Sequence, residues 1–283
     1  MASKMRNFVL GGAQLGRGYG FYEKVPELST SQINDLLGSA NKLGIAEIDL
    51  AQNYAGVFEK LAEQPLLPQF ELSTKFKYRK GHETEIIKEL KSSLKKTSKE
   101  IFQNVLVHNW HELEIEGKIE SLNLLKSLKD EGICRKIGLS VYETKELIDG
   151  VEETNFIQAP LSFFNRTFLN SQNPRALQSL GVVFQARSIF HQGTLLNQES
   201  ISESFPDELR IFTEYCLKNS LSYLEGALSV YDGQNLFTSL VVGVASEDQL
   251  REITQTRVVH AALSVEGQKS DFPIKLTDPR LWT

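Results

Sequence analysis

The sequence predicts an α/β protein folded as a (β/α)8 (TIM) barrel, with a single domain spanning residues 1–283. Eight short apolar segments alternate along the chain with segments of helical periodicity, and no change of composition marks a linker. Continuous apolar strands indicate a parallel sheet that is covered by helices. Eight such units in a chain of this length fit a closed barrel better than an open doubly wound sheet.

The first half of the chain contains four of these units. Short buried strands are predicted at residues 7–10, 46–50, 70–74 and 104–108. Ser29 and Gln32 form a capping box that begins the first helix, and Gly44 ends it. Further helices are predicted around residues 58–62 and over 83–97. A longer helix ends at Gly132, with an inward face made of Ile119, Leu122, Leu125 and Leu128.

The second half repeats the pattern. Strands are predicted at residues 136–139, 156–159, 182–185 and 239–242. Asn173 and Pro174 predict the start of a short helix, with the asparagine as cap and the proline in the first position. Ser246 and Gln249 cap the last clear helix. The remaining helices are expected at residues 143–151, 207–218 and 223–231.

Composition restricts the classes of partner. The net charge of -5, with no basic stripe, argues against a nucleic-acid surface. No apolar run approaches the roughly 18 residues that a membrane span needs. Cys134 and Cys216 are too few for a disulfide framework, which favours a cytoplasmic location. No HExxH, CxxC or carboxylate cluster has metal-ligand spacing, so we expect no metal site. The oligomeric state is left open.

Polar side chains gather where the predicted strands end. Asp49 and Tyr54 follow the second strand, Lys75 the third and His108 the fourth. An ammonium group beside a phenol would lower the pKa of that phenol, so Lys75 and Tyr54 suggest a proton-donor site. No N-terminal strand end shows a comparable cluster. Other strand ends carry Ser140, Gln158, Arg187, Ser188 and Gly243.

These residues resemble a known family. The segment LGGAQLG at residues 10–16, Asp49 followed by Tyr54, Lys75 after Ser-Thr, and His108 in Val-His-Asn-Trp are similar to the aldo/keto reductase superfamily. The resemblance covers most of the chain. It implies an NADPH cofactor and the reduction of a small aldehyde or ketone to an alcohol. It makes Tyr54 the general acid, tuned by Lys75 and Asp49, and His108 the residue that orients the substrate oxygen.

The resemblance also implies residues that bind the cofactor. Gly12 belongs to the glycine-rich first loop, and Ser140 and Gln158 match the side chains that hold the nicotinamide carboxamide. Arg187, before Ser188, stands where relatives often place an aromatic ring that stacks on the nicotinamide. The segment from Gly243 to Gln249 resembles the loop that grips the adenosine phosphate.

Three departures from the family pattern leave alternatives open: Val141 in place of an asparagine beside Ser140, Arg187 in place of an aromatic ring, and a phosphate loop without basic side chains at Gly243 and Gln249. The phosphate loop leaves NADH open beside NADPH. Together, the three changes leave open a barrel with weakened catalysis that acts as a binding or regulatory subunit. The segment His191-Gln192-Gly193 either lines the substrate mouth or is a plain loop. The C-terminal tail, with Phe272, Pro273 and Trp282, either covers the barrel mouth or packs outside it.

Overall fold

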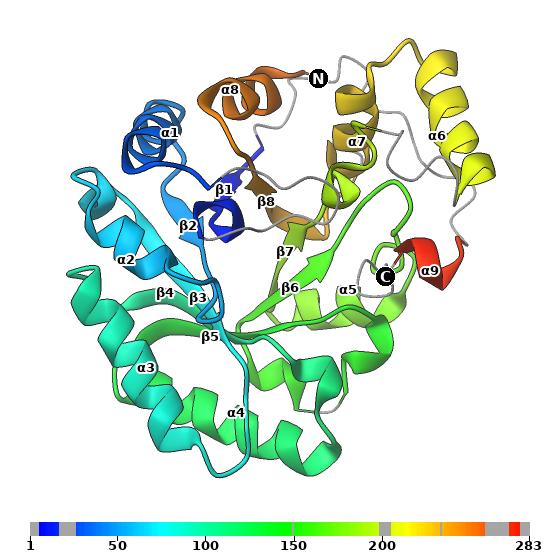
Figure 1. Cartoon of the computed structure of the whole chain (residues 1–283). Helices are drawn as coiled ribbons and strands as arrows, with labels where there is room; N and C mark the ends of the chain where they lie inside the picture. Colours follow the sequence, from blue (N-terminus) through cyan, green and yellow to red (C-terminus); the bar gives the residue numbers. More distant parts are fainter. Residues whose placement is uncertain are drawn as a thin grey trace.

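The structure, a computed structural model, contains a closed barrel of eight parallel strands in sequence order (Figure 1). It describes residues 6–16, 27–148, 150–197, 205–232, 234–257 and 272–277. Strand β8 closes the barrel on β1, where Leu10 pairs with Val242 and Gly11 with Gly243. The predicted fold class is therefore confirmed. The strands are β1 Phe8–Gly11, β2 Glu47–Asp49, β3 Glu71–Phe76, β4 Phe102–Val107, β5 Cys134–Ser140, β6 Phe156–Pro160, β7 Val183–Arg187 and β8 Phe237–Gly243.

Helices surround the barrel (Figure 1). The capping box of α1 forms as predicted: the Ser29 hydroxyl accepts from the Gln32 N–H at 3.3 Å, and the Gln32 side chain accepts from the Ser29 N–H at 2.9 Å. The Ser246 hydroxyl likewise caps α8. The helices are α1 Thr30–Lys42, α2 Val57–Ala62, α3 Glu83–Lys96, α4 Ile115–Asp130, α5 Gln172–Ser179, α6 Pro206–Lys218, α7 Tyr223–Asp232, α8 Glu247–Gln255 and α9 Ile274–Thr277.

The helix predicted at residues 143–151 is wrong. Two separate 3-10 turns, Thr144–Glu146 and Val151–Glu153, occupy this connection. The Glu146 carboxylate accepts from the backbone N–H groups of Tyr142 and Glu143, at 3.2 and 3.0 Å, which closes the chain locally. Gly150 then adopts a left-handed φ of 93°, which ends any continuous helix. These local hydrogen bonds determine the conformation here, although the spacing of the apolar residues is that of a helix.

Two helix details also differ from the predictions. Ser171, and not Asn173, occupies the N-cap position of helix α5, without a side-chain capping hydrogen bond. Pro174 lies inside the first turn, where a missing N–H costs nothing. On α4, Ile119 is 54% exposed although Leu122, Leu125 and Leu128 are buried. A helix turns 100° per residue, so a stripe at every third position drifts half a turn between residues 119 and 128. The inward face of α4 is centred on the later leucines.

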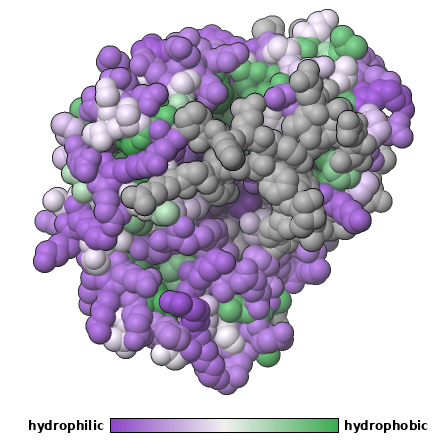
Figure 2. All heavy atoms as spheres, viewed as in Figure 1, coloured by the Kyte–Doolittle hydropathy of each residue, from purple (hydrophilic) through white to green (hydrophobic). Residues whose placement is uncertain are grey.

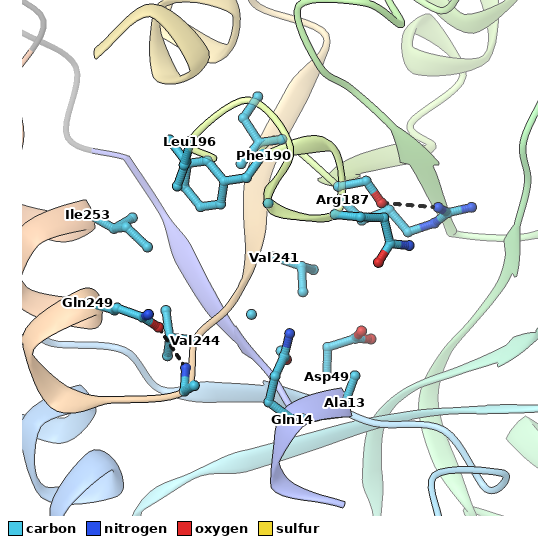
Figure 3. Close-up of a pocket in the computed structure, with 18 of the residues that line it drawn as sticks. Ala13, Gln14, Asp49, Arg187, Phe190, Leu196, Val241, Val244, Gln249 and Ile253 are labelled. Carbon is cyan, nitrogen blue, oxygen red and sulfur yellow. Dashed lines mark hydrogen bonds between the residues drawn. The ribbon is translucent and has the colours of Figure 1, made fainter. Parts of the chain in front are cut away.

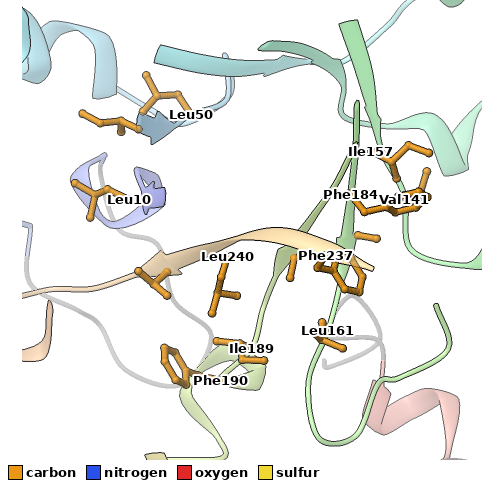
Figure 4. Close-up of a cluster of buried hydrophobic side chains, with 14 of the residues drawn as sticks. Leu10, Leu50, Val141, Ile157, Leu161, Phe184, Ile189, Phe190, Phe237 and Leu240 are labelled. Atoms are coloured by element: carbon orange, nitrogen blue, oxygen red, sulfur yellow. The ribbon is translucent and has the colours of Figure 1, made fainter. Parts of the chain in front are cut away.

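The strands alternate between an outer apolar layer and a polar interior. Outward side chains such as Ile48, Leu72 and Ile157 join the hydrophobic cluster beneath the helices, part of which is drawn in Figure 4. Their neighbours Asp49 and Ser73 form hydrogen bonds inside the barrel. This alternation follows from the two-residue period of a strand.

A second polar cluster lies deeper in the barrel, which corrects the expectation that the N-terminal strand ends carry none. Glu47 begins β2, and its carboxylate accepts from the Ser73 hydroxyl at 2.5 Å. The Asn104 amide donates to the same Glu47 oxygen at 3.1 Å and to Ser73 at 2.7 Å. Burial is the main reason that the pKa of Glu47 is raised, and Asp49 adds to it.

The described part of the C-terminal tail packs beside the loop that follows β6. The Phe272 ring lies 5.1 Å from Phe164 and 6.2 Å from Phe163, measured between ring centroids. Leu276 of α9 is fully buried. Pro273 is exposed, and Trp282 lies outside the described residues.

On the face drawn in Figure 2, the described residues are mostly hydrophilic, with scattered apolar patches. In the described part of the chain, no helix combines the length and the apolar character needed to cross a membrane. The thiols of Cys134 and Cys216 are both buried and free.

Candidate active site

A cavity of about 790 Å³ opens among the C-terminal ends of the barrel strands (Figure 3). This volume lies within the range of sites that take small molecules and cofactors. The cavity wall includes every residue singled out in the sequence: Gly12, Asp49, Tyr54, Lys75, His108, Ser140, Gln158, Arg187, Ser188, Gly243 and Gln249. Gln192 and Gly193 also line it, whereas the His191 side chain is buried and lies outside the lining.

A buried ion pair lies at the centre of the site. The Lys75 ammonium contacts both carboxylate oxygens of Asp49, at 2.6 and 2.5 Å. Lys75 is 2% exposed and Asp49 4%. Burial lowers the pKa of Lys75 from its usual value, and the Asp49 carboxylate opposes that shift. Strands β2 and β3 are parallel neighbours, so their C-terminal ends bring the two groups together.

Tyr54 follows β2 on a loop that side chains fasten to the barrel. Gln52 donates to the Thr74 hydroxyl at 3.1 Å and accepts from the Ser93 hydroxyl at 2.8 Å, which ties the loop to β3 and α3. The Lys75 nitrogen lies 6.0 Å from the centre of the Tyr54 ring. The loop therefore holds the phenol beside the ion pair.

His108 faces Tyr54 from the end of β4. The two ring centroids are 6.5 Å apart, with an interplanar angle of 86°. Burial, followed by the charges of Lys75 and Arg187, lowers the pKa of His108 to about 3. Its Nδ1 atom is buried and has no hydrogen-bond partner within the described residues. His108 is thus a neutral ring at physiological pH.

A chain of amides crosses the barrel from the ion pair. The Gln158 amide donates to Asp49 at 3.0 Å and to the Gln185 oxygen at 2.7 Å, and Gln185 donates to the Ser239 hydroxyl at 3.1 Å. Ser140 pairs with Gln158 in the sheet register. Gln158 Oε1 is buried without a partner among the described residues, so it is available to a ligand amide.

Arg187, at the end of β7, lies flat against Tyr142. The guanidinium carbon is 4.2 Å from the Tyr142 ring centroid. Its Nη2 donates to the Val141 carbonyl at 3.0 Å, and its Nη1 approaches the Ser188 hydroxyl at 3.5 Å. The Val141 side chain itself belongs to the outer apolar layer.

The far arm of the cavity lies between β1, β8 and α8 (Figure 3). A Cβ atom at Gly243 would lie 2.6 Å from the Gln14 amide oxygen, so the glycine lets the Gln14 side chain approach β8 closely. Gln14 Oε1 is buried and, in the described structure, has no partner. Gln249 accepts from the Ala245 N–H at 2.8 Å, which shapes the loop before α8.

Four contributors were not singled out in the sequence: Gln14, Glu47, Tyr142 and Gln185. Gln14 lies inside the segment that carries the family resemblance, and that position was a usable signal. Gln185 is the register partner of Gln158, which only the sheet pairing reveals. Tyr142 acquires its role through space, by stacking on Arg187.

The arrangement suits proton transfer and binding of an amide-bearing cofactor. A phenol lies beside a buried ammonium, and Gln158 and Gln14, each with an unpartnered amide oxygen among the described residues, line one cavity. Among the described residues, no three His, Cys, Asp or Glu side chains gather closely enough to hold a metal ion.

Comparisons with known proteins identify a family and a shared fold. The aldo/keto reductase family model matches residues 7–264. Two solved structures from Pseudomonas aeruginosa, provisionally named aldo-keto reductases, are similar at 19% and 18% identity, with TM-scores of 0.65 and 0.67. The first alignment covers 90% of both chains, and the second 90% of this chain and 89% of the other.

A third similar structure is the holo form of the aldo-keto reductase AKR11C1 from Bacillus halodurans. It is 17% identical, with a TM-score of 0.67, over 88% of this chain and 85% of that chain. At these identities the structural matches establish the fold alone. A search of curated proteins gave no match.

Proposed function

Because the chain belongs to the aldo/keto reductase family, we propose that it is an NAD(P)H-dependent oxidoreductase that reduces a small aldehyde or ketone to an alcohol. The observation that carries the proposal is the buried Lys75–Asp49 ion pair beside Tyr54, in a cavity at the C-terminal end of the barrel. Active sites of (β/α)8 enzymes lie at this end.

Tyr54 acts as the proton donor to the carbonyl oxygen. A free phenol, with a pKa near about 10, is a weak acid at neutral pH. The Lys75 ammonium favours the phenolate and so makes the proton easier to give. Asp49 holds Lys75 in place through contacts of 2.6 and 2.5 Å.

His108 orients the carbonyl oxygen and does not supply the proton. With its pKa lowered to about 3, the ring carries no extra proton near neutral pH. It can still form a hydrogen bond with the substrate oxygen as a neutral ring. The proton therefore comes from Tyr54, which faces the same space.

The cofactor is NADPH or NADH, and when bound its nicotinamide supplies the hydride. Ser140 and the unpartnered Gln158 oxygen would hold the carboxamide, and Arg187 and Ser188 line the same cavity. Gln14, Gly12 and Gly243 line the path toward the arm at Gln249. A cofactor held by these groups would lie in the same cavity as Tyr54.

Equilibrium titration and turnover test the proposal together. NADPH and NADH are titrated separately while protein fluorescence is followed, and a panel of small aldehydes and ketones is then added to the complex. The proposal expects sub-millimolar binding of at least one cofactor and its oxidation by a carbonyl compound. If neither cofactor binds, the reductase assignment fails. Binding without turnover of any carbonyl would support a binding or regulatory subunit instead.

A further inference from the structure

The charged side chains that line the cavity are not all paired with an opposite charge. Four of its described lining residues, apart from the neutral His108, carry a charged group: Asp49, Lys75, Arg187 and Glu252. Asp49 and Lys75 neutralise each other at 2.5 Å. Glu252 lies on α8, in the far arm. At the reacting end, Arg187 is thus the cation without a carboxylate partner among the described residues.

Among the residues that the structure describes, the groups that hold the Arg187 side chain are all neutral. They are the Val141 carbonyl, the Ser188 hydroxyl and the face of the Tyr142 ring. A guanidinium has five N–H donors in a rigid fork, and these contacts use only two of them. The side chain is therefore fixed in place with donors to spare. A partly buried guanidinium with unused N–H donors can bind an oxyanion through charge-assisted hydrogen bonds.

The position of Arg187 suits contact with a substrate at the reacting end of the cavity better than contact with a ligand group in the far arm. Tyr142, on which it lies, packs 5.0 Å from His111, in the turn that follows His108. Figure 3 shows the Arg187 guanidinium directed away from the arm that ends at Gln249 and Ile253. After burial and Lys75, the charge of Arg187 is the next cause of the lowered pKa of His108. Arg187 therefore acts on the side where a carbonyl oxygen would meet His108.

We propose that Arg187 binds an oxyanion on the substrate, so that the preferred substrate is an aldehyde or ketone bearing a carboxylate or a phosphate. The inference rests on the proposed reductase function and adds the class of carbonyl compound. A charge-assisted hydrogen bond in a partly buried site changes affinity by roughly tenfold to a hundredfold. The guanidinium fork, held over the Tyr142 ring, supplies that bond.

Pairs of an anionic carbonyl compound and a closely related neutral one test this directly. Glyoxylate, succinic semialdehyde and 4-formylbenzoate are each compared with their methyl esters, and glyceraldehyde 3-phosphate with glyceraldehyde. The spacing between anion and carbonyl differs from pair to pair, so one pair should fit the distance from Arg187 to the reacting centre. We expect kcat/KM for at least one anion to exceed that of its neutral partner by about tenfold or more.

Two variants test whether the Arg187 side chain causes the preference for anionic substrates. Arg187→Met keeps the length but removes the charge, and should lower the anion-to-neutral ratio of kcat/KM by at least about tenfold. Arg187→Lys keeps the charge without the fork and should restore part of the ratio. Because each ratio is taken within one variant, a general loss of activity or cofactor affinity cancels out.

Several results would overturn the inference. One is a wild-type enzyme that prefers no anion, and another is a ratio that Arg187→Met leaves unchanged. If Arg187→Met weakens NADH and NADPH binding tenfold while the ratio stays constant, the oxyanion belongs to the cofactor. If no carbonyl is reduced at all, the proposed function fails. In that case, calorimetric titration of the four anions into the wild type and into Arg187→Met tests the oxyanion site without turnover. Equal affinities of the two proteins for the anions would contradict the site.

Discussion

Glu47 has a carboxyl group inside the barrel, deeper than the Lys75–Asp49 pair. Its Oε1 atom accepts from Ser73 at 2.5 Å and from Asn104 at 3.1 Å. Burial raises the pKa of Glu47, so the folded protein keeps a proton that the unfolded chain releases as pH rises. The stabilising effect of Glu47 is therefore present at low pH and is lost as pH rises above its unfolded pKa.

Glu47→Gln should thus be tolerated. An amide oxygen can accept the same two hydrogen bonds without the buried charge, so the variant should match or exceed the wild type at pH 8, by on the order of 0.5 kcal/mol. The gain should shrink at pH 5. The control, Glu47→Leu, strands the Ser73 and Asn104 donors and should cost about 1–3 kcal/mol at both pH values. Urea unfolding measures all three proteins, and a Gln variant as unstable as the Leu variant would refute this account.

The buried histidines have the opposite pH dependence. The pKa of His108 is lowered to about 3 and that of His191 to about 4, in both cases mainly by burial. A lowered folded pKa means that the unfolded chain binds more protons, so stability is full above pH 6.5 and falls below it. When the pH is lowered from 7.5 to 5.5, each of these histidines should lower the free energy of unfolding by roughly 1 kcal/mol.

The contribution of one histidine is measured by the slope of the free energy of unfolding against pH. His191→Gln should unfold in urea with a flatter pH dependence than the wild type, while replacement of the exposed His82 by Gln should leave the slope unchanged. An unaltered slope in His191→Gln would show that burial of this ring does not depress its pKa.

At the scale of elements, the contact between β5 and β6 depends on a missing side chain. A Cβ atom at Gly138 would lie 2.3 Å from the Phe156 carbonyl oxygen. Two residues further on, Ser140 pairs with Gln158, so any separation of the strands would also displace the site.

Gly138→Ala should therefore destabilise the protein by about 1–3 kcal/mol and weaken cofactor binding. Gly117→Ala is the matched control, because on α4 the nearest atom to its added Cβ would be 3.7 Å away. That change should be neutral or stabilise by about 0.5 kcal/mol. Denaturation and cofactor titration of both variants check the prediction, which equal stabilities would contradict.

Sequence patterns predicted the elements well where the signal was local. All eight strands lie where apolar runs predicted them, and the caps of α1 and α8 form as expected. The helix at residues 143–151 failed because Glu146 satisfies backbone donors that a helix would have used. Gln185 and Tyr142 were missed because their partners are distant in sequence and meet them only through the barrel register. Contacts of that kind leave no periodicity to read.

For the whole molecule, a closed barrel with one core should unfold as a unit. A ligand bound only by the folded state stabilises it by about 2.7 kcal/mol at a hundred times its Kd. NADPH or NADH at that excess should raise the Tm by several degrees. ATP, which has phosphates but no nicotinamide, is the control. Equal shifts with ATP and with both dinucleotides would mean that the residues around Gln158 and Ser140 do not recognise the nicotinamide.

The central claim is that Tyr54 gives the proton, and Tyr54→Phe tests it most directly. Phenylalanine keeps the ring that lies 6.5 Å from His108 and removes only the hydroxyl. The measurement is kcat for the best carbonyl substrate, with the Kd of the cofactor determined in the same preparations. We predict that kcat falls by at least about a hundredfold while the cofactor Kd changes by less than about twofold. A Tyr54→Phe enzyme that reduces the carbonyl at the wild-type rate would contradict the account.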